Sequence, residues 1–310
     1  MKGSIFKFGL LLLLFFSVSD VYAKCIKGNC KNGKGTYTWR DGSKYTGEFK
    51  NGKMNGSGEY VDHKKDTYIG PFKNGKLHGK GKIKFKDGSF CEGFFRNGKL
   101  FGKGYYQFRD GSWYRGMWRN DVMHGKGVLK NKDGTYTGSF LYGKITGYGV
   151  FKFKEGDVYK GYFRNAKFHG KGELTYKKGA IYSGTFRYGK MFGRGKYVDE
   201  YGNIYIGQFR NARIFGHGKY IGKNGKKYIG YFRNGFKYGK GTLIFPSGAK
   251  YTGNFVNDKF HGYGTYIAKN KVKYIGYFRN NKMHGRGAIY RPNGKLHKRG
   301  VWRNGKYFKK

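Results

Sequence analysis

Hydrophobic and polar residues alternate along this chain in short stretches that return at a fixed interval. Tyr45, Gly47 and Phe49 stand two residues apart, with polar residues between them. Alternate positions of a strand share one face, so the pattern predicts a β-strand with one apolar face. Asn51-Gly52 follows. Asn-Gly tolerates positive φ at both central positions of a two-residue turn and is the strongest short hairpin signal.

The stretch that precedes each such strand predicts a second kind of strand. It reads Gly-x-Gly and then aromatic residues at alternate positions, as in Gly33, Gly35, Tyr37 and Trp39, and an Asp-Gly turn follows at 41–42. Each unit is therefore predicted to be one β-hairpin, and the turns join the hairpins into a meander. Helix is excluded because five to seven glycines per unit would interrupt any helical apolar stripe.

The hairpin unit occurs twelve times, and successive starts are 23 residues apart at nine of the eleven intervals. A short fixed period is typical of an array of small units. We therefore predict an all-β fold, an elongated single-sheet meander of repeated β-hairpins with a solenoid-like build. Imperfect units start at Cys91 and Lys298. The repeat anchors singled out are Tyr45, Gly47, Phe49, Tyr68, Gly70, Phe72, Tyr114, Gly116, Trp118, Tyr136, Gly138 and Phe140.

The glycines of this chain recur at fixed positions of the repeat and do not mark a flexible segment. Twelve anchor glycines and twelve Gly-x-Gly pairs account for 36 of the 57 glycines. Glycine inside a strand normally weakens it, so a glycine at the same sites in every unit argues for packing. We expect rings from neighbouring strands to lie flat over a backbone that has no Cβ. The alternative is that these glycines only punctuate loops.

The pattern resembles the MORN repeat family (membrane occupation and recognition nexus). The resemblance rests on the Tyr-x-Gly-x-Phe anchors with Asn-Gly-Lys and on the apolar-His-Gly-x-Gly segments at His78, His124, His169, His261 and His284. It covers roughly residues 32–306. It implies an antiparallel sheet of hairpins and no particular chemistry. Members of the family scaffold membrane junctions, dimerise, bind other proteins or carry an attached enzyme.

The ends of the chain differ from the repeats. Met1–Ala23 has two lysines, an apolar run from Phe8 to Ser19 and Val21-Tyr22-Ala23 before a cleavage point, which predicts a signal peptide. The run is short for a membrane span of about 20 residues, although a retained anchor is the alternative. The predicted location is secreted, periplasmic or cell-envelope, or lumenal in a eukaryote. The remaining segments are 24–31 with two cysteines, the array at 32–306 and a basic tail at 307–310.

The three cysteines are expected to play different roles. Cys25 and Cys30 are close in sequence, and in an exported chain they can form a small disulfide loop, the alternative being two unpaired thiols. Cys91 takes the place of an anchor tyrosine and is expected to pack as a small apolar residue. No further cysteine or histidine lies near the first two, so no metal site is expected.

Positive charge follows the repeat as well. The formal net charge is +48. Lys or Arg follows the anchor aromatic in ten of twelve units and follows the turn in ten of twelve. Rows of like charge near one Debye length apart repel each other, and a bound polyanion would relieve the repulsion. The other reading is solubility, which needs far less charge. The candidate anion-binding residues are Lys50, Lys53, Lys73, Lys76, Arg96, Lys99, Arg119, Arg164, Lys167, Arg187, Lys190, Arg210, Arg213, Arg233, Arg279 and Lys282.

The sequence offers little for catalysis. The acidic residues are few, several stand in turns, and no nucleophile motif or phosphate-binding loop occurs. We therefore expect no enzyme, no cofactor and no metal. The leading hypothesis is an exported array that binds anionic lipid or another polyanion through its Lys and Arg rows. The alternative is a protein-interaction or self-associating scaffold that uses the aromatic face. Nucleic acid fits the charge and aromatic content but is disfavoured by the export signal.

Overall fold

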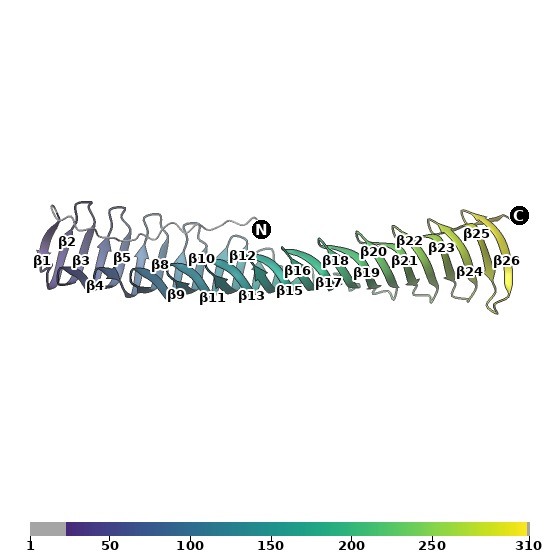
Figure 1. Ribbon diagram of the computed structural model, residues 1–310, viewed down its shortest axis with the longest axis horizontal. Coiled ribbons are helices and arrows are strands. Elements are labelled where there is room, and N and C mark those ends of the chain that lie inside the picture. Colours follow the sequence, from purple (N-terminus) through teal and green to yellow (C-terminus); the bar gives the residue numbers. More distant parts are fainter. Residues whose placement is uncertain (1–22, 309–310) are drawn as a thin grey trace. The chain divides into compact units, whose positions relative to one another are not determined.

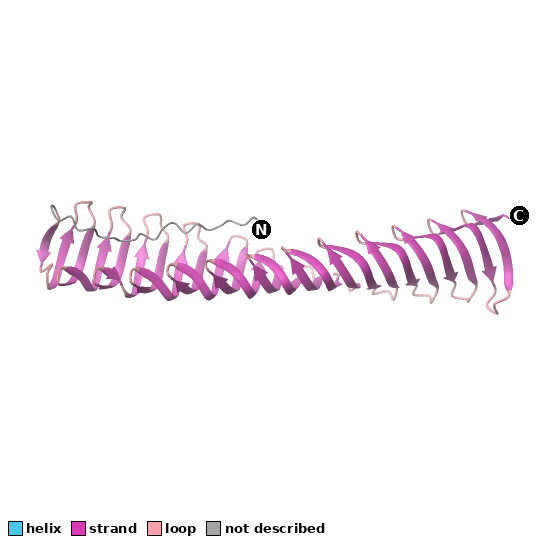
Figure 2. Ribbon diagram, viewed as in Figure 1, coloured by secondary structure: helices cyan, strands magenta, loops and turns pink. Residues whose placement is uncertain are grey.

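A computed structural model describes residues 23–308 of the chain. This part consists of strands and turns and contains no helix (Figure 2). It accordingly offers no helix long and apolar enough to cross a membrane. The predicted signal peptide lies outside the described residues except for Ala23. The predicted all-β fold of repeated hairpins is confirmed.

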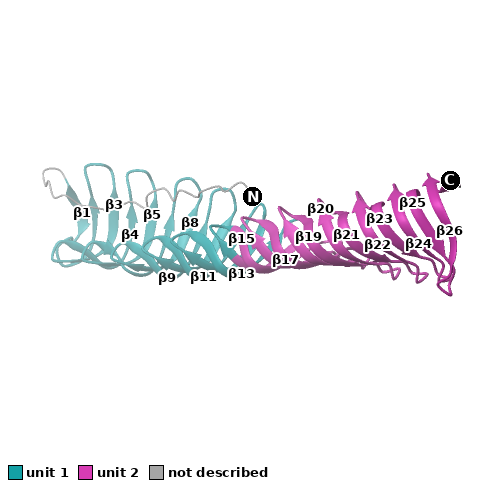
Figure 3. Cartoon of the chain, turned by 45° about the vertical axis from the view of Figure 1, so that its right-hand side comes forward, with its two compact units in different colours: residues 1–154, 163–166 teal, residues 155–162, 167–310 magenta. Residues whose placement is uncertain are grey.

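The strands fall into two compact units (Figure 3), and within each unit they pair antiparallel in chain order. Unit 1 covers the described residues up to Lys154 together with 163–166. Its strands are β1 (Lys24–Gly28), β2 (Gly33–Thr38), β3 (Lys44–Lys50), β4 (Lys53–Val61), β5 (Thr67–Lys73), β6 (Lys76–Leu77), β7 (Gly79–Lys84), β8 (Phe90–Arg96), β9 (Lys99–Gln107), β10 (Trp113–Arg119), β11 (Val122–Asn131), β12 (Gly134–Leu141) and β13 (Lys144–Phe153) (Figure 1).

Unit 2 covers residues 155–162 and the described residues from Lys167 onwards, so β14 (Val158–Arg164) is divided between the units. Its other strands are β15 (Lys167–Thr175), β16 (Ile181–Arg187), β17 (Lys190–Val198), β18 (Ile204–Arg210), β19 (Arg213–Ile221), β20 (Lys227–Arg233), β21 (Phe236–Ile244), β22 (Lys250–Val256), β23 (Lys259–Ile267), β24 (Lys273–Arg279), β25 (Lys282–Tyr290), β26 (Leu296–Arg303) and β27 (Lys306–Phe308).

The anchor tyrosine of each hairpin lies flat over a pair of glycines. In the hairpin of β16 and β17, Gly184 pairs with Gly195 across the strands, and the Tyr182 ring covers both. A Cβ on Gly184 would lie 2.5 Å from Tyr182 Oη, and one on Gly195 would lie 2.6 Å from Tyr182 Cε2. The expected room for a ring is therefore real, and the ring covers a glycine of its own strand as well as one of the neighbouring strand.

A hydrogen bond locks each anchor ring in this position. Tyr182 Oη donates to the carbonyl of Thr185, three residues along its own strand, at 3.0 Å. A β-bulge lies between Gly184 and Thr185, so the strand bends where the hydroxyl reaches it. The same bond forms at all ten anchor tyrosines, namely Tyr45, Tyr68, Tyr114, Tyr136, Tyr159, Tyr182, Tyr205, Tyr228, Tyr251 and Tyr274.

The anchor rings join neighbouring hairpins edge to face. The Tyr182 ring lies 5.1 Å from Phe186 of its own anchor and 4.9 Å from Phe209 of the next, with interplanar angles of 90° and 78°. Such pairs contribute about 0.5–1.5 kcal/mol beyond the area they bury. The contacts continue from Tyr159 to Trp302 in unit 2. The core of each unit is thus a strip of rings along one face of the strands.

Unit 1 departs from this pattern at Cys91, which is buried and has no disulfide partner. The glycine pair next to it, Gly93 and Gly104, has no tyrosine ring above it. A Cβ on Gly93 would instead meet Leu100 Cδ1 at 2.9 Å, and one on Gly104 would meet Trp118 Cδ1 at 2.9 Å. Trp118 stands at the phenylalanine position of the following anchor. Its larger ring fills the space that a tyrosine at position 91 would occupy.

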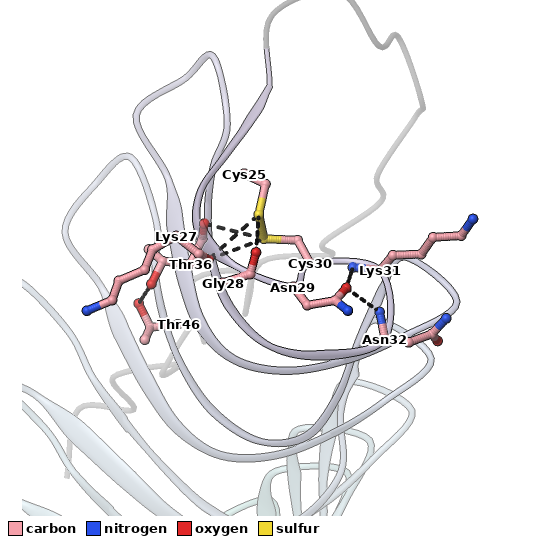
Figure 4. Close-up of a disulfide and its surroundings, with 9 residues drawn as sticks. All are labelled: Cys25, Lys27, Gly28, Asn29, Cys30, Lys31, Asn32, Thr36 and Thr46. Carbon is pink, nitrogen blue, oxygen red and sulfur yellow. Dashed lines mark hydrogen bonds between the residues drawn. A yellow bond between two sulfur atoms is a disulfide. The ribbon is translucent and has the colours of Figure 1, made fainter.

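The first hairpin is closed by a disulfide between Cys25 and Cys30 (Figure 4). The bond joins β1 to the loop before β2. Gly35 pairs with Gly28 on one side and with Gly47 on the other, and a Cβ there would lie 2.8 Å from Cys30 Sγ. The disulfide sulfur therefore covers this paired glycine, where later hairpins use a tyrosine.

The last hairpin is closed by a ring from outside the repeat. Lys298 stands at the tyrosine position and has no ring, but Tyr307 on β27 lies over Gly300. Tyr307 Oη donates to the Arg299 carbonyl at 2.9 Å, and its ring lies 5.1 Å from Trp302. Tyr307 is predicted from the sequence to lie in a basic tail, whereas in the structure it completes the packing of the final hairpin.

We predict that Cys91 and Trp118 are energetically coupled. Cys91→Tyr alone should destabilise the protein by about 1–3 kcal/mol, because the new ring meets the Trp118 indole. Trp118→Phe alone should also destabilise it, because it leaves a void. The double variant restores the usual Tyr and Phe pair and should be more stable than either single variant. Urea unfolding of all four proteins measures the coupling.

The matched control combines Cys91→Tyr with Trp302→Phe, which removes an anchor tryptophan from the other unit. These two changes should be additive within about 0.5 kcal/mol. An equally large coupling in the control, or additivity of Cys91→Tyr with Trp118→Phe, would show that Trp118 does not compensate for Cys91.

We further predict that the anchor tyrosines resist ionisation until the fold opens. Burial raises the pKa of Tyr45, Tyr182 and Tyr251 to about 12, against about 10 for an ordinary tyrosine. A raised pKa contributes stability that is complete below pH 10 and is lost as the pH rises towards 12. Absorbance at 295 nm should therefore show a late step that coincides with loss of near-ultraviolet circular dichroism. A single step near pH 10 with the fold intact would contradict this.

Candidate anion-binding face

Each strand presents its anchor residues on one face and its cations on the other. In β3, Tyr45 and Phe49 are buried, whereas Lys44 and Lys50 are exposed. The strand that follows continues the alternation, with Met54 buried and Lys53 exposed. We call the surface opposite the anchor rings the cation face. All sixteen candidate anion-binding residues are exposed strand-end residues.

The two predicted rows of cations meet in pairs. The turn is only two residues long, so the residue that ends one strand faces the residue that begins the next. The register pairs Lys50 with Lys53, Lys73 with Lys76 and Arg96 with Lys99 in unit 1. In unit 2 it pairs Arg187 with Lys190, Arg210 with Arg213 and Arg279 with Lys282. Like charges directly opposite each other across two strands are destabilising.

Four candidate residues have other surroundings. Arg119 faces Val122, and Arg233 faces Phe236, so one apolar residue interrupts each pair. Arg164 ends β14 within unit 1, and Lys167 begins β15 within unit 2. The chain also replaces the cation after the anchor by Leu141 and Val256. The predicted rows are therefore discontinuous.

Backbone geometry fixes the turns that carry these cations. Asn51 and Gly52 have φ values of 52° and 71°, the conformation for which Asn-Gly is suited. The turn also bonds to the preceding hairpin, since Gly52 N donates to Lys31 O at 2.9 Å and Gly75 N donates to Met54 O at 2.9 Å. The same bond recurs along each unit. It holds successive turns, and the cations beside them, at a constant spacing.

Few acids neutralise this face. The described residues contain three ion pairs, His63 with Asp41, Lys82 with Glu92 and Lys237 with Asp258. None includes a candidate anion-binding residue. Some acids are committed to the opposite turns, because Asp87 accepts hydrogen bonds from the backbone N–H and the hydroxyl of Ser89. The hydrogen bond from the Ser89 hydroxyl lowers the pKa of Asp87.

Several arginines have an aromatic partner that the sequence pattern did not predict. Arg96 lies over the Phe101 ring, Arg187 over Phe192, Arg210 over Phe215 and Arg233 over Tyr238, with Cζ 5.3–5.8 Å from the ring centroid. Each partner lies five residues after its arginine, on the far side of the turn. This spacing is visible in the sequence. It becomes meaningful once the turn length fixes which residues face each other.

The cation face also exposes apolar side chains. Tyr263 and Tyr277 face each other across β23 and β24, with ring centroids 5.4 Å apart. With Ile275, Arg286 and Arg299 they line a hollow of ≈ 450 Å³. The anchor rings on the other face are buried by one another. Aromatic side chains therefore stand on both faces, since the half-buried Tyr197 and Tyr220 pair with the anchor tyrosines Tyr205 and Tyr228.

The fold defines a β-hairpin repeat protein whose strands carry exposed cations opposite the anchor rings. Within residues 23–308 no three His, Cys, Asp or Glu side chains gather into a group that could hold a metal ion. The chain belongs to the MORN repeat family. The family model matches twelve repeats, at residues 27–44, 45–67, 68–90, 91–113, 114–135, 136–158, 159–181, 182–200, 205–227, 228–250, 251–271 and 274–295. The family model places its first repeat at 27–44, before the first predicted unit, and does not include the imperfect unit that starts at Lys298.

Comparison with other proteins adds little beyond the family. No curated protein matches the chain. Among solved structures, the TCP10 domain of Danio rerio CPAP is 16% identical over 71% of this chain and 99% of that chain, with a TM-score of 0.35. The same domain in complex with a peptide of Danio rerio STIL is 11% identical over 91% and 100%, with a TM-score of 0.30. Scores this low carry no argument about function.

Proposed function

We propose that the cation face binds a polyanionic surface, such as anionic phospholipid headgroups or an acidic cell-envelope polymer. The supporting observation is the register of the hairpins, which sets Lys or Arg opposite Lys or Arg with no acid between them. The free protein bears this repulsion, and a bound polyanion removes it. The predicted signal peptide supports an interaction that takes place after the protein is exported. The proposed role is non-enzymatic.

The mechanism depends on many small contributions. Each Lys or Arg near an anionic membrane surface contributes about 1 kcal/mol, and salt screens the attraction. The inter-hairpin hydrogen bonds keep neighbouring cations at a constant spacing, so a surface with mobile anionic headgroups can adjust to the protein. Affinity should then depend on the number of cations more than on any one of them.

A protein partner is the second candidate. The observation that favours it is the exposed apolar set on the cation face, with Ile206, Ile229 and Tyr231 each about half exposed, at 46%, 47% and 53%. Lys219 lies between Ile206 and Ile229 in the strand register, so apolar and cationic side chains mix on this surface. This candidate predicts binding that persists in high salt, whereas the polyanion proposal predicts binding that salt abolishes.

We predict that Lys50, Lys73, Arg96 and Arg119 act together. Replacing all four by Gln should weaken binding to anionic liposomes by a few kcal/mol at low salt. One replacement should change the affinity several-fold at most. Raising the salt from about 50 to 500 mM should remove most of the difference. Liposome sedimentation measures the binding, and circular dichroism should show an unchanged fold because these side chains are exposed.

A matched control removes the same charge from the opposite turns of the same unit. The changes are Lys64→Gln, Lys86→Gln, Arg109→Gln and Lys132→Gln, all at exposed positions. The control should bind more tightly than the first variant. If the first variant binds as the parent does at low salt, the cation pairs are not the binding site and the protein-partner candidate takes first place.

A further inference from the structure

One hairpin turn in unit 2 departs from the repeat in a way that concentrates cationic groups. A hollow of ≈ 520 Å³ is lined by Lys190, Arg210, Asn211, Arg213, Phe215 and Asn234. These residues come from three successive turns. The backbone ties the turns together, since Ala212 N donates to Met191 O and Gly235 N to Ile214 O, each at 3.0 Å. The hollow is therefore part of the folded hairpin stack and not a gap between loose loops.

One facing pair that lines this hollow is unique in the chain. Arg210 and Arg213 face each other at the end of β18 and β19. No other turn of the twelve has Arg on both sides. An Arg guanidinium is always charged and carries donors in a planar fork, which matches two oxygens of a phosphate or carboxylate at once. Two forks opposite each other suit a tetrahedral group with several equivalent oxygens.

Aromatic rings hold the arginines of this region in place. Arg187, Arg210 and Arg233 are the arginines of three successive hairpins, and each lies over an aromatic ring, those of Phe192, Phe215 and Tyr238. At the same position most other hairpins have His, Asn or Thr. Stacking restricts the side chain and leaves the donor edge of the guanidinium free. Less ordering is then required when an anion binds.

From these features we infer that the hollow between the turns at 187–190, 210–213 and 233–236 binds a phosphomonoester group. The inference rests on the proposed anion-binding function and makes it specific. Three cationic side chains face the hollow, and none of its lining residues is acidic. A phosphomonoester has up to two negative charges and three free oxygens, whereas a phosphodiester has one charge and two such oxygens. The two guanidinium forks and the amides of Asn211 and Asn234 supply the donors. Phe215 supplies an apolar wall for the group that bears the phosphate.

The test uses inorganic phosphate as the probe, measured by calorimetry on the full chain in about 150 mM salt. At that ionic strength charges beyond about 8 Å contribute little. The parent should bind at one saturable site. Arg210→Gln with Arg213→Gln should lower the affinity about tenfold per lost arginine, since each removes charge-assisted hydrogen bonds. Arg210→Lys with Arg213→Lys keeps the charge but removes the forks, and it should still lose about tenfold.

The matched control is Arg279→Gln with Lys282→Gln, which removes the same charge from another facing pair of unit 2. It should change phosphate affinity less than twofold. Near-ultraviolet circular dichroism should match the parent for every variant. Equal losses in the control, or parent-like binding by Arg210→Gln with Arg213→Gln, would overturn the site. Retention of full affinity by the lysine variant would overturn the role of the forks.

Two further probes distinguish a free phosphate ester from a lipid headgroup as the source of the phosphomonoester. Glycerol 1-phosphate tests a free ester, and phosphatidylcholine vesicles with phosphatidic acid test a lipid headgroup, against phosphatidylglycerol vesicles of equal charge. The Arg210 and Arg213 variant should lose the preference for phosphatidic acid and keep the binding to phosphatidylglycerol. Vesicle binding without any saturable phosphate binding would overturn the site and leave the proposed function standing. Saturable phosphate binding without any vesicle binding would leave the site standing and overturn a lipid surface as the polyanion.

Discussion

The packing of a tyrosine ring on two facing glycines is the interaction on which the rest of this structure depends. The ring needs the space that two Cβ atoms would fill, and its hydroxyl binds the carbonyl beside the bulge. The hydrophobic layer of each hairpin thereby lies directly on its own backbone. A sheet covered by its own rings needs no second layer of helices or strands. Within residues 23–308 no further strand covers the opposite face, and the repeat places cations at its strand ends.

The same geometry explains why the cations come in facing pairs. A two-residue turn with positive φ at both positions brings the flanking residues opposite each other. The hydrogen bond from each turn to the preceding hairpin sets the distance to the next pair. Charge on this protein is therefore ordered by the backbone. The cost in repulsion is distributed over many pairs and is removed when a polyanion binds, which is the physical basis of the proposed function.

Much of the fold follows from sequence because the signals are local. Alternation predicts the strands, Asn-Gly predicts the turns, and the 23-residue period predicts the array. The departures from the repeat could not be interpreted without knowing which residues meet across strands. Cys91 looks like a simple loss of a ring until Trp118 is seen over Gly104. Tyr307 lies nine residues beyond Lys298, so its role in covering Gly300 is not visible from the repeat. The hollow at Arg210 depends on three turns at once, and only the register brings them together.

The central claim is that the anchor glycines are required for the ring above them and not for backbone freedom. Gly184 and Gly179 both lie in unit 2, and they distinguish these two explanations. Gly179 has a φ of 94° with nothing within 4 Å of an added Cβ, whereas a Cβ on Gly184 would lie 2.5 Å from Tyr182 Oη and 2.7 Å from Gly195 Cα. The measurement is the free energy of unfolding in urea for Gly184→Ala and Gly179→Ala. Strain at positive φ should cost Gly179→Ala about 1 kcal/mol, and displacement of the ring should cost Gly184→Ala about 3 kcal/mol. A loss in Gly179→Ala equal to or larger than that in Gly184→Ala would contradict the account.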